Sequence, residues 1–125
     1  MRLLLDSHSL WWTVRGSPRL STNAQALILD DYNDVFYSPV CLYEIVFKAS
    51  RGRMPRTAMH LPEAVRSSGF REIALTSLHL VHAARVEWDH GDPWDRILLA
   101  QALLEDMDLI SADRVFDSQT ERRLW

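Results

Sequence analysis

The chain has 125 residues, of which 47% are hydrophobic and 25% charged, values typical of one globular domain. Its single cysteine, Cys41, rules out an internal disulfide framework and suits a reducing compartment. No stretch approaches the roughly 20 apolar residues that span a bilayer, so we expect a cytoplasmic protein without membrane association.

Strands and helices alternate through the first half of the chain. The apolar run Leu3–Leu5 predicts a buried strand ending at Asp6. Three helices are predicted where a capping residue precedes spaced apolar residues. They run from Ser7 or Ser9 through Val14, from Thr22 to Asp31 after Ser21, and from Pro39 to near Gly52. Val35–Ser38 predicts a second strand.

The second half continues this alternation. Residues 53–62 are expected to be irregular, followed by a helix from about Pro62 to Ser68. The remaining elements are a strand over Phe70–Leu75, a helix from Thr76 or Ser77 towards Trp88, a helix from Pro93 to about Asp106, a strand over Leu109–Ser111, and a short element in the tail. We therefore expect a single α/β domain over residues 1–125, with a mostly parallel sheet of four or five strands flanked by helices.

Acidic residues recur near the predicted carboxyl ends of strands. Asp6 follows the first strand and Asp113 lies just after the fourth. Asp95 sits in the first turn of the helix before the fourth strand, and Glu44 lies about one turn into the helix after the second. Because open parallel sheets bind ligands at this edge, the four carboxylates are expected to converge. Asp92, one turn before Asp95, is either a fifth member or a helix N-cap.

Clustered carboxylates repel one another, and a divalent cation relieves that repulsion. Ligation by oxygen alone favours Mg²⁺ or Mn²⁺. Such ions activate water and stabilise the charge that develops in phosphoryl transfer, so the pattern favours phosphodiester hydrolysis. Each acid taken alone has a simpler interpretation, as a turn residue, a cap or a solvated helix residue.

Four segments of the chain carry a recognisable pattern: Leu3–His8, Ser38–Ile45, His90–Ala102 and Leu109–Asp113. They resemble the successive signatures of PIN domains, most closely those of VapC-type toxins. The resemblance implies a PIN-like three-layer fold and a metal site formed by Asp6, Glu44, Asp95 and Asp113. It places Ser111 where threonine is usual and Trp94 where phenylalanine is commoner. Supporting candidates are Ser111, Asp92, Arg96 and Ser7.

The same resemblance implies an endoribonuclease that uses metal-activated water, blocked by a cognate antitoxin and forming a homodimer or a toxin–antitoxin hetero-oligomer. Arg96 or Arg114 is a candidate for stabilising the extra negative charge. Three alternatives remain open. They are a nuclease of RNA maturation or DNA without an antitoxin, a non-catalytic PIN-like binding module, and another acid-rich hydrolase.

Other residues have both functional and structural interpretations. The net charge of −3 argues mildly against nucleic-acid binding, although Lys48, Arg51, Arg53 and Arg56 form a basic patch. One of the adjacent Trp11 and Trp12 is expected to pack inside and the other to contact a partner. His8, His79 and His82 are expected to pack or cap rather than bind metal, and Cys41 to be a small buried residue.

Overall fold

A five-stranded parallel sheet forms the centre of the computed structural model, which describes residues 1–125. The strands are β1 (Arg2–Leu5), β2 (Asp34–Tyr37), β3 (Arg71–Glu72), β4 (Asp108–Ile110) and β5 (Arg123–Leu124), in the order β3-β2-β1-β4-β5. Leu3, Leu4 and Leu5 of the central strand are completely buried, as expected for a strand covered on both faces. The predicted α/β class and mostly parallel sheet are confirmed.

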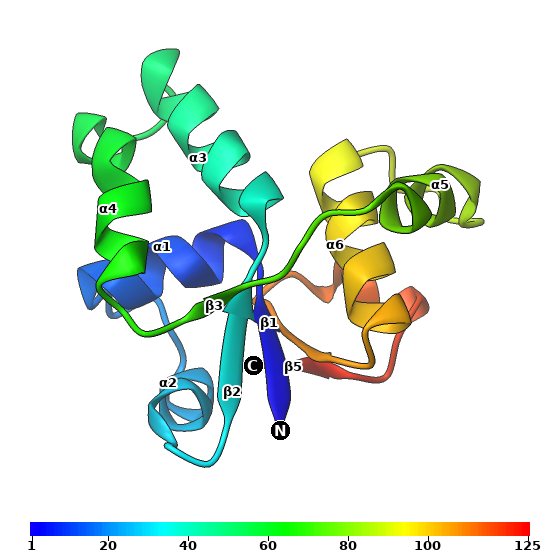
Figure 1. Cartoon of the computed structure of the whole chain (residues 1–125), viewed down its shortest axis with the longest axis horizontal. Helices are drawn as coiled ribbons and strands as arrows, with labels where there is room; N and C mark the ends of the chain where they lie inside the picture. Colours follow the sequence, from blue (N-terminus) through cyan, green and yellow to red (C-terminus); the bar gives the residue numbers. More distant parts are fainter.

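Six α-helices and two 3₁₀ helices surround the sheet. They are α1 (Ser7–Arg15), α2 (Thr22–Leu29), α3 (Pro39–Ser50), α4 (Leu61–Arg66), α5 (Ser77–Arg85), α6 (Pro93–Leu104), η1 (Arg56–His60) and η2 (Arg114–Ser118). Helices α1, α2 and α4 lie on one side of the strands and α5 and α6 on the other (Figure 1). No helix has the length and apolar character needed to cross a membrane.

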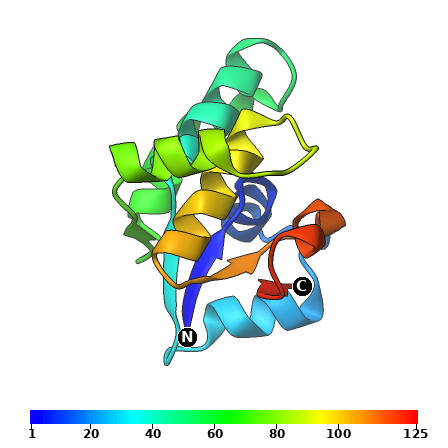
Figure 2. The ribbon, with the colours of Figure 1, turned by 90° about the vertical axis from the view of Figure 1, so that its right-hand side faces the viewer.

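Both chain termini lie near α2, as the turned view shows (Figure 2). The Asn23 side-chain amide donates to the carbonyl of Trp125 over 3.2 Å, and the amino group of Met1 donates to Asn33. These bonds hold the first and last residues against the same helix and turn. Met1 precedes β1 at the amino end of the sheet, whereas Trp125 follows β5 at the carboxyl end, because Leu124 is in register with Ile110.

The third strand is much shorter than predicted. Only Arg71–Glu72 pairs with β2, and the strand expected over Phe70–Leu75 is wrong at both ends. This strand lies at the sheet edge, where hydrogen bonds form on one side only and pairing stops early. The segment expected to be irregular contains η1, and the tail supplies η2 and β5.

The core lies between the sheet and the helices and includes Trp11, which is only 8% exposed. Trp12 is half-buried and packs beside Trp125, with ring centroids 5.9 Å apart. The expectation that one tryptophan of the pair packs inside is therefore confirmed.

One buried polar side chain in α6 lacks any hydrogen-bond partner. Both amide atoms of Gln101 are unsatisfied, and the residue is completely buried. An unpaired buried amide is destabilising, so Gln101→Met should raise the free energy of unfolding by about 1 kcal/mol. Urea denaturation measures this, with Gln101→Glu as a destabilised comparison. A less stable methionine variant would show that the amide has a stabilising contact.

Candidate active site

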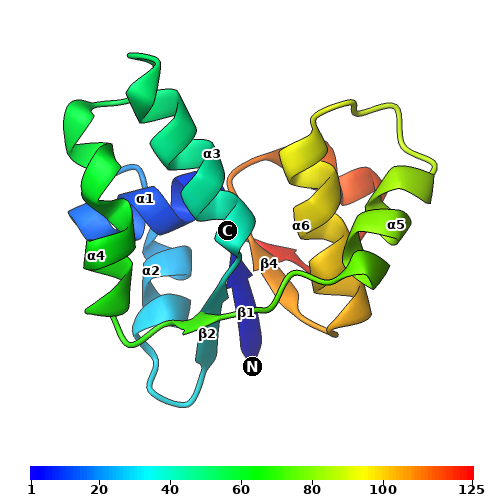
Figure 3. The same cartoon turned by 45° about the horizontal axis from the view of Figure 1, so that its top comes forward.

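The register of the central strands brings three polar residues together at the carboxyl edge of the sheet. Leu5 is opposite both Tyr37 and Ile110. The next residue on each strand is therefore also aligned, and these residues are Asp6, Ser38 and Ser111. All three are buried, and the Asp6 amide donates to the carbonyl of Ile110 over 3.1 Å. Helices α3 and α6 flank this end of β1 (Figure 3).

Asp6 joins the sheet edge to the first helix. Its Oδ1 accepts a hydrogen bond from the Ser9 amide over 2.7 Å and caps α1. The helix begins at Ser7, one of the two predicted starts, and its cap is Asp6. Burial raises the pKa of Asp6, and hydrogen bonds from Ser111 and Ser9 partly offset this rise. A bound cation would favour the charged carboxylate of such a buried group.

Glu44 reaches the same edge from α3. The Ser7 hydroxyl donates to Glu44 Oε1 over 2.6 Å, and Lys48 forms an ion pair with Oε2. Glu44 is only 6% exposed, so this neutralising partner is what permits its burial. Both of its carboxylate oxygens are thus held by neighbouring side chains.

Asp95, Asp92 and His90 form the tightest group of potential metal ligands. One ligand atom from each lies within 4.8 Å of the others. Asp92 also caps α6, because its Oδ1 accepts from the amides of Trp94 and Asp95. The Nε2 of His90 is 2.6 Å from Asp95 Oδ2. Burial, with added repulsion from Asp92 and Glu44, raises the pKa of Asp95 to about 6.

Asp113 lies at the outer end of this arrangement. Its carboxylate is exposed and caps η2 by accepting from the Val115 amide over 3.0 Å. Its own amide donates to the Ser111 hydroxyl, which also bonds to Asp6. Asp113 is therefore connected to Asp6 through Ser111, but its ligand atoms, like those of Asp6 and Glu44, are not part of the close group of three.

Arg96 has a structural environment that differs from the expected charge-stabilising role. Its guanidinium donates four hydrogen bonds to main-chain carbonyls, those of Ala83, Val86, Trp88 and His90. An arginine has five N–H donors, so little of this group is available to a substrate phosphate. Arg96 instead holds the segment between α5 and α6, including His90. Arg114, next to Asp113, is exposed.

Sequence reasoning missed two members of the site. Lys48, which the sequence places in a basic patch, is four residues after Glu44 on one helix, a spacing that predicts the ion pair it forms. His90 lies just before α6, and no local sequence signal shows that its side chain turns towards Asp95 of that helix. The group that lies closest together thus contains an imidazole beside two carboxylates, and ligation by oxygen alone stays a prediction.

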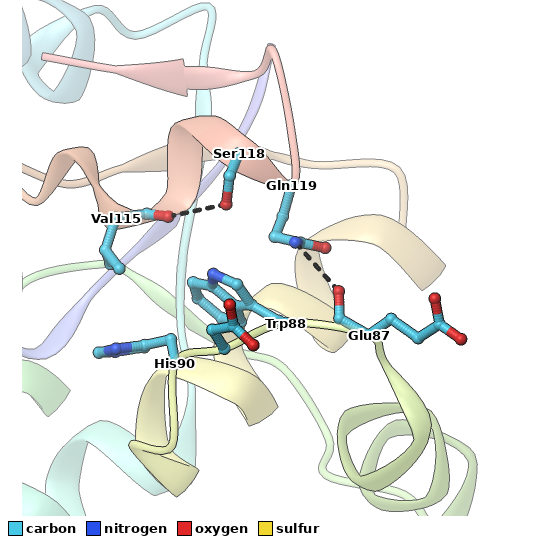
Figure 4. Close-up of a pocket in the computed structure, with 7 residues that line it drawn as sticks. Glu87, Trp88, His90, Val115, Ser118 and Gln119 are labelled. Carbon is cyan, nitrogen blue, oxygen red and sulfur yellow. Dashed lines mark hydrogen bonds between the residues drawn. The ribbon is translucent and has the colours of Figure 1, made fainter.

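A cavity of about 660 Å³ borders this group at His90 (Figure 4). Its lining residues are Glu87, Trp88, Asp89, His90, Val115, Ser118 and Gln119. The Trp88 ring packs between the rings of His90 and Phe116, at 4.8 and 5.6 Å, which orients the imidazole. The cavity therefore lies directly beside a candidate metal ligand.

Cys41 and His79 have structural environments, as expected. Burial raises the pKa of Cys41 to about 12, so its thiol is neutral and a poor nucleophile. His79 is buried, completes a capping box with Thr76, and pairs with Glu105 over 2.8 Å.

The donor set fits a divalent cation. Two carboxylates and one imidazole lie within mutual reach, and two further buried acids lie beside them. The raised pKa values of Asp6 and Asp95 show that the charged state of this edge is unfavourable without added positive charge. The residues that can hold such an ion are Asp92, Asp95 and His90, with Asp6 and Glu44 alongside.

Comparison with known proteins identifies the family of the chain. Residues 3–121 match the family model described as PIN domain. The chain belongs to the PIN-domain family. No curated protein matches this PIN domain significantly.

Three solved structures share the fold of this PIN domain. VapBC2 from Rickettsia felis, bound to a promoter DNA fragment, has a TM-score of 0.69 at 14% identity, over 94% of this chain and 92% of the other. VapC20 from Mycobacterium tuberculosis, a sarcin-ricin loop cleaving toxin, has a TM-score of 0.68 at 19% identity, over 93% of both chains. A toxin–antitoxin complex from Klebsiella pneumoniae has a TM-score of 0.63 at 21% identity, over 98% and 96%.

Proposed function

We propose that this PIN domain is a metal-dependent endoribonuclease that hydrolyses phosphodiester bonds in RNA. One observation carries the proposal. Ligand atoms of His90, Asp92 and Asp95 lie within 4.8 Å of one another, at a sheet edge that also holds the buried acids Asp6 and Glu44. An acidic pocket of this kind suits hard divalent cations and phosphoryl transfer.

In the proposed site, Asp92, Asp95 and His90 hold Mg²⁺ or Mn²⁺, and Asp6, Glu44 and Asp113 complete the acidic pocket. An ion held there would supply Lewis-acid chemistry, lowering the pKa of water and offsetting the negative charge of the phosphate. Supporting bonds within the chain orient these acids: Ser7 donates to Glu44 and Ser111 to Asp6. Lys48 limits the repulsion by pairing with Glu44. Arg114 is exposed and available to a substrate phosphate.

We further propose that this endoribonuclease is the toxin of a toxin–antitoxin pair. The support is the shared fold with VapC20, described as cleaving the sarcin-ricin loop, and with two toxin–antitoxin assemblies. By this likeness the chain has a cognate antitoxin that blocks the acidic site, and forms a homodimer or a hetero-oligomer with it. The lone buried Cys41 suits the reducing cytoplasm.

Cleavage mapping on total cellular RNA tests the activity. Purified protein, free of any partner, is incubated with the RNA in Mg²⁺, in Mn²⁺ or in EDTA, and new 5′ ends are sequenced. We expect defined cuts with either metal and none in EDTA. Single-stranded DNA of matched sequence is a second substrate, and preferential DNA cleavage would instead favour a DNA nuclease.

Asp6→Asn is the matched inactive control. Asparagine is as good an N-cap as aspartate, so α1 should remain intact while the charge is lost. We expect cleavage to fall at least about 100-fold, as for loss of a charge-stabilising group. Unchanged cutting by this variant, or cutting that persists in EDTA, would refute the proposed metal-dependent site.

A further inference from the structure

A second cavity, of about 470 Å³, lies along α1 next to the acidic edge. Its lining residues are His8, Trp11, Trp12, Arg15, Gly16, Ser17, Pro18, Arg19, Met54 and Pro55. None of these is acidic, although the chain as a whole carries a formal charge of −3. The cavity is thus a locally positive site on an acidic protein, and its volume falls in the usual range for ligand pockets, roughly 300–1,000 Å³.

The charged side chains of this cavity point to an anionic ligand. Arg15 and Arg19 are both exposed, and neither forms an ion pair. The segment that supplies Met54 and Pro55 is flanked by two further exposed arginines, Arg53 and Arg56. The Arg15 guanidinium lies over the Trp11 ring, 5.0 Å from its centroid. Arginines without acidic partners gathered on one surface match the phosphates of a nucleic acid.

The aromatic side chains suit a nucleobase. His8 is exposed, and its ring lies 5.5 Å from that of Trp12 with an interplanar angle of 35°. Trp12 also packs against Trp125, and both tryptophans contact the hydrophobic core, which fixes the position of the Trp12 ring. Rings placed beside a basic groove are how proteins bind single-stranded nucleic acids with little sequence preference.

The position of the cavity relates it to the acidic site. His8 is two residues after Asp6, in the first turn of α1. At roughly 1.5 Å per residue, Trp12 lies about 9 Å from Asp6 along the helix axis. A strand whose phosphate sits at Asp6 would therefore bring a neighbouring nucleotide to the cavity.

We infer that this cavity binds a nucleotide of a single-stranded RNA substrate next to the cleaved bond, with the base against His8 and Trp12 and the phosphates against Arg15 and Arg19. The inference rests on the proposed function, because it assumes that RNA reaches the acidic edge. It adds a binding site that lies outside the metal-ligand group.

Binding to labelled oligoribonucleotides tests the phosphate contacts. Fluorescence anisotropy is measured in EDTA, so that no cleavage occurs, with 12-nucleotide oligo(U) and oligo(A) across a range of salt. For single strands the log–log salt slope changes by about 0.7 per phosphate contact. We expect Arg19→Ala to lower the slope by about 0.7 and Arg15→Ala/Arg19→Ala by about 1.4. Arg85→Ala, an exposed arginine of α5 across the sheet, is the matched control (Figure 1).

Base contact is tested separately. His8→Ala should weaken binding of oligo(U) and oligo(A) about fivefold, His8→Phe should restore it, and neither should change binding of an abasic oligomer with the same phosphates.

Unchanged slopes in both arginine variants would overturn the inference. So would arginine variants that lose only self-association or binding to a protein partner. These results leave the proposed function standing, whereas full cleavage by Asp6→Asn would refute that function whatever the cavity binds.

Discussion

Without metal, Asp95→Asn is expected to be more stable than the wild type at pH 7 by about 1–2 kcal/mol, and to lose strong Mn²⁺ binding. Burial, with the nearby charges of Asp92 and Glu44, raises the pKa of Asp95 to about 6 from 3.8. This shift alone corresponds to about 3 kcal/mol, and solvent screening of the partly exposed side chain makes the contribution smaller.

The sign of the pH dependence follows from proton binding. Between about pH 4 and 6 the folded chain holds a proton on Asp95 that the unfolded chain has released. The stability contributed by Asp95 is therefore complete below about pH 4 and is lost as the pH rises through 6. Asparagine cannot ionise, so the variant keeps that stability at neutral pH.

Urea denaturation in EDTA measures both effects. The stability difference between Asp95→Asn and the wild type should be present at pH 7 and vanish at pH 4. Added Mn²⁺ at 100 times its dissociation constant should then stabilise the wild type by about 2.7 kcal/mol, and the variant much less. A difference that is the same at both pH values would show that Asp95 does not ionise in an unfavourable environment.

Arg96→Ala is expected to lower the free energy of unfolding by about 3 kcal/mol. Four main-chain carbonyls between Ala83 and His90 accept hydrogen bonds from this one guanidinium. Removing it leaves part-buried carbonyls without partners and frees the segment that positions His90. We therefore expect weaker Mn²⁺ binding as well as lower stability.

Thermal unfolding and hydrogen exchange check this expectation. The midpoint should fall by roughly 10 °C, and amides of residues 86–92 should exchange faster than those of β1. Arg96→Lys preserves the charge but not the planar fork, so it should recover only part of the loss. Arg114→Ala is the control, because Arg114 is exposed. If Arg96→Ala kept full stability but lost RNA cleavage, Arg96 would instead act on the substrate.

The elements that depend on local signals could be predicted from the sequence. Leu3–Leu5 is buried as an apolar run should be, and Pro93 begins α6 directly after its cap at Asp92. The short length of β3 could not be predicted, because it depends on where the neighbouring strand β2 ends. That strand ends at Tyr37, which pairs with Glu72. Single-strand patterns carry no information about that pairing.

The site was predictable to the extent that parallel strands share one carboxyl edge. Asp6 and Ser111 meet there because Leu5 and Ile110 are in register. The hydrogen-bond partners of Arg96 could not be predicted from the sequence, because they are main-chain carbonyls, which every residue has. The position of His90 depends in turn on Arg96 and Trp88, and so only the folded chain reveals it.

Both margins of the sheet end in strands of only two residues, β3 and β5, and each carries an arginine, Arg71 and Arg123. Such short edge strands expose few unpaired main-chain groups, and the arginine on each edge repels the same edge of another copy. Both features disfavour edge-to-edge pairing of sheets and amyloid formation. We therefore expect copies of this chain to associate through helix surfaces and side chains. Addition of a strand from another chain to either edge of the sheet is disfavoured.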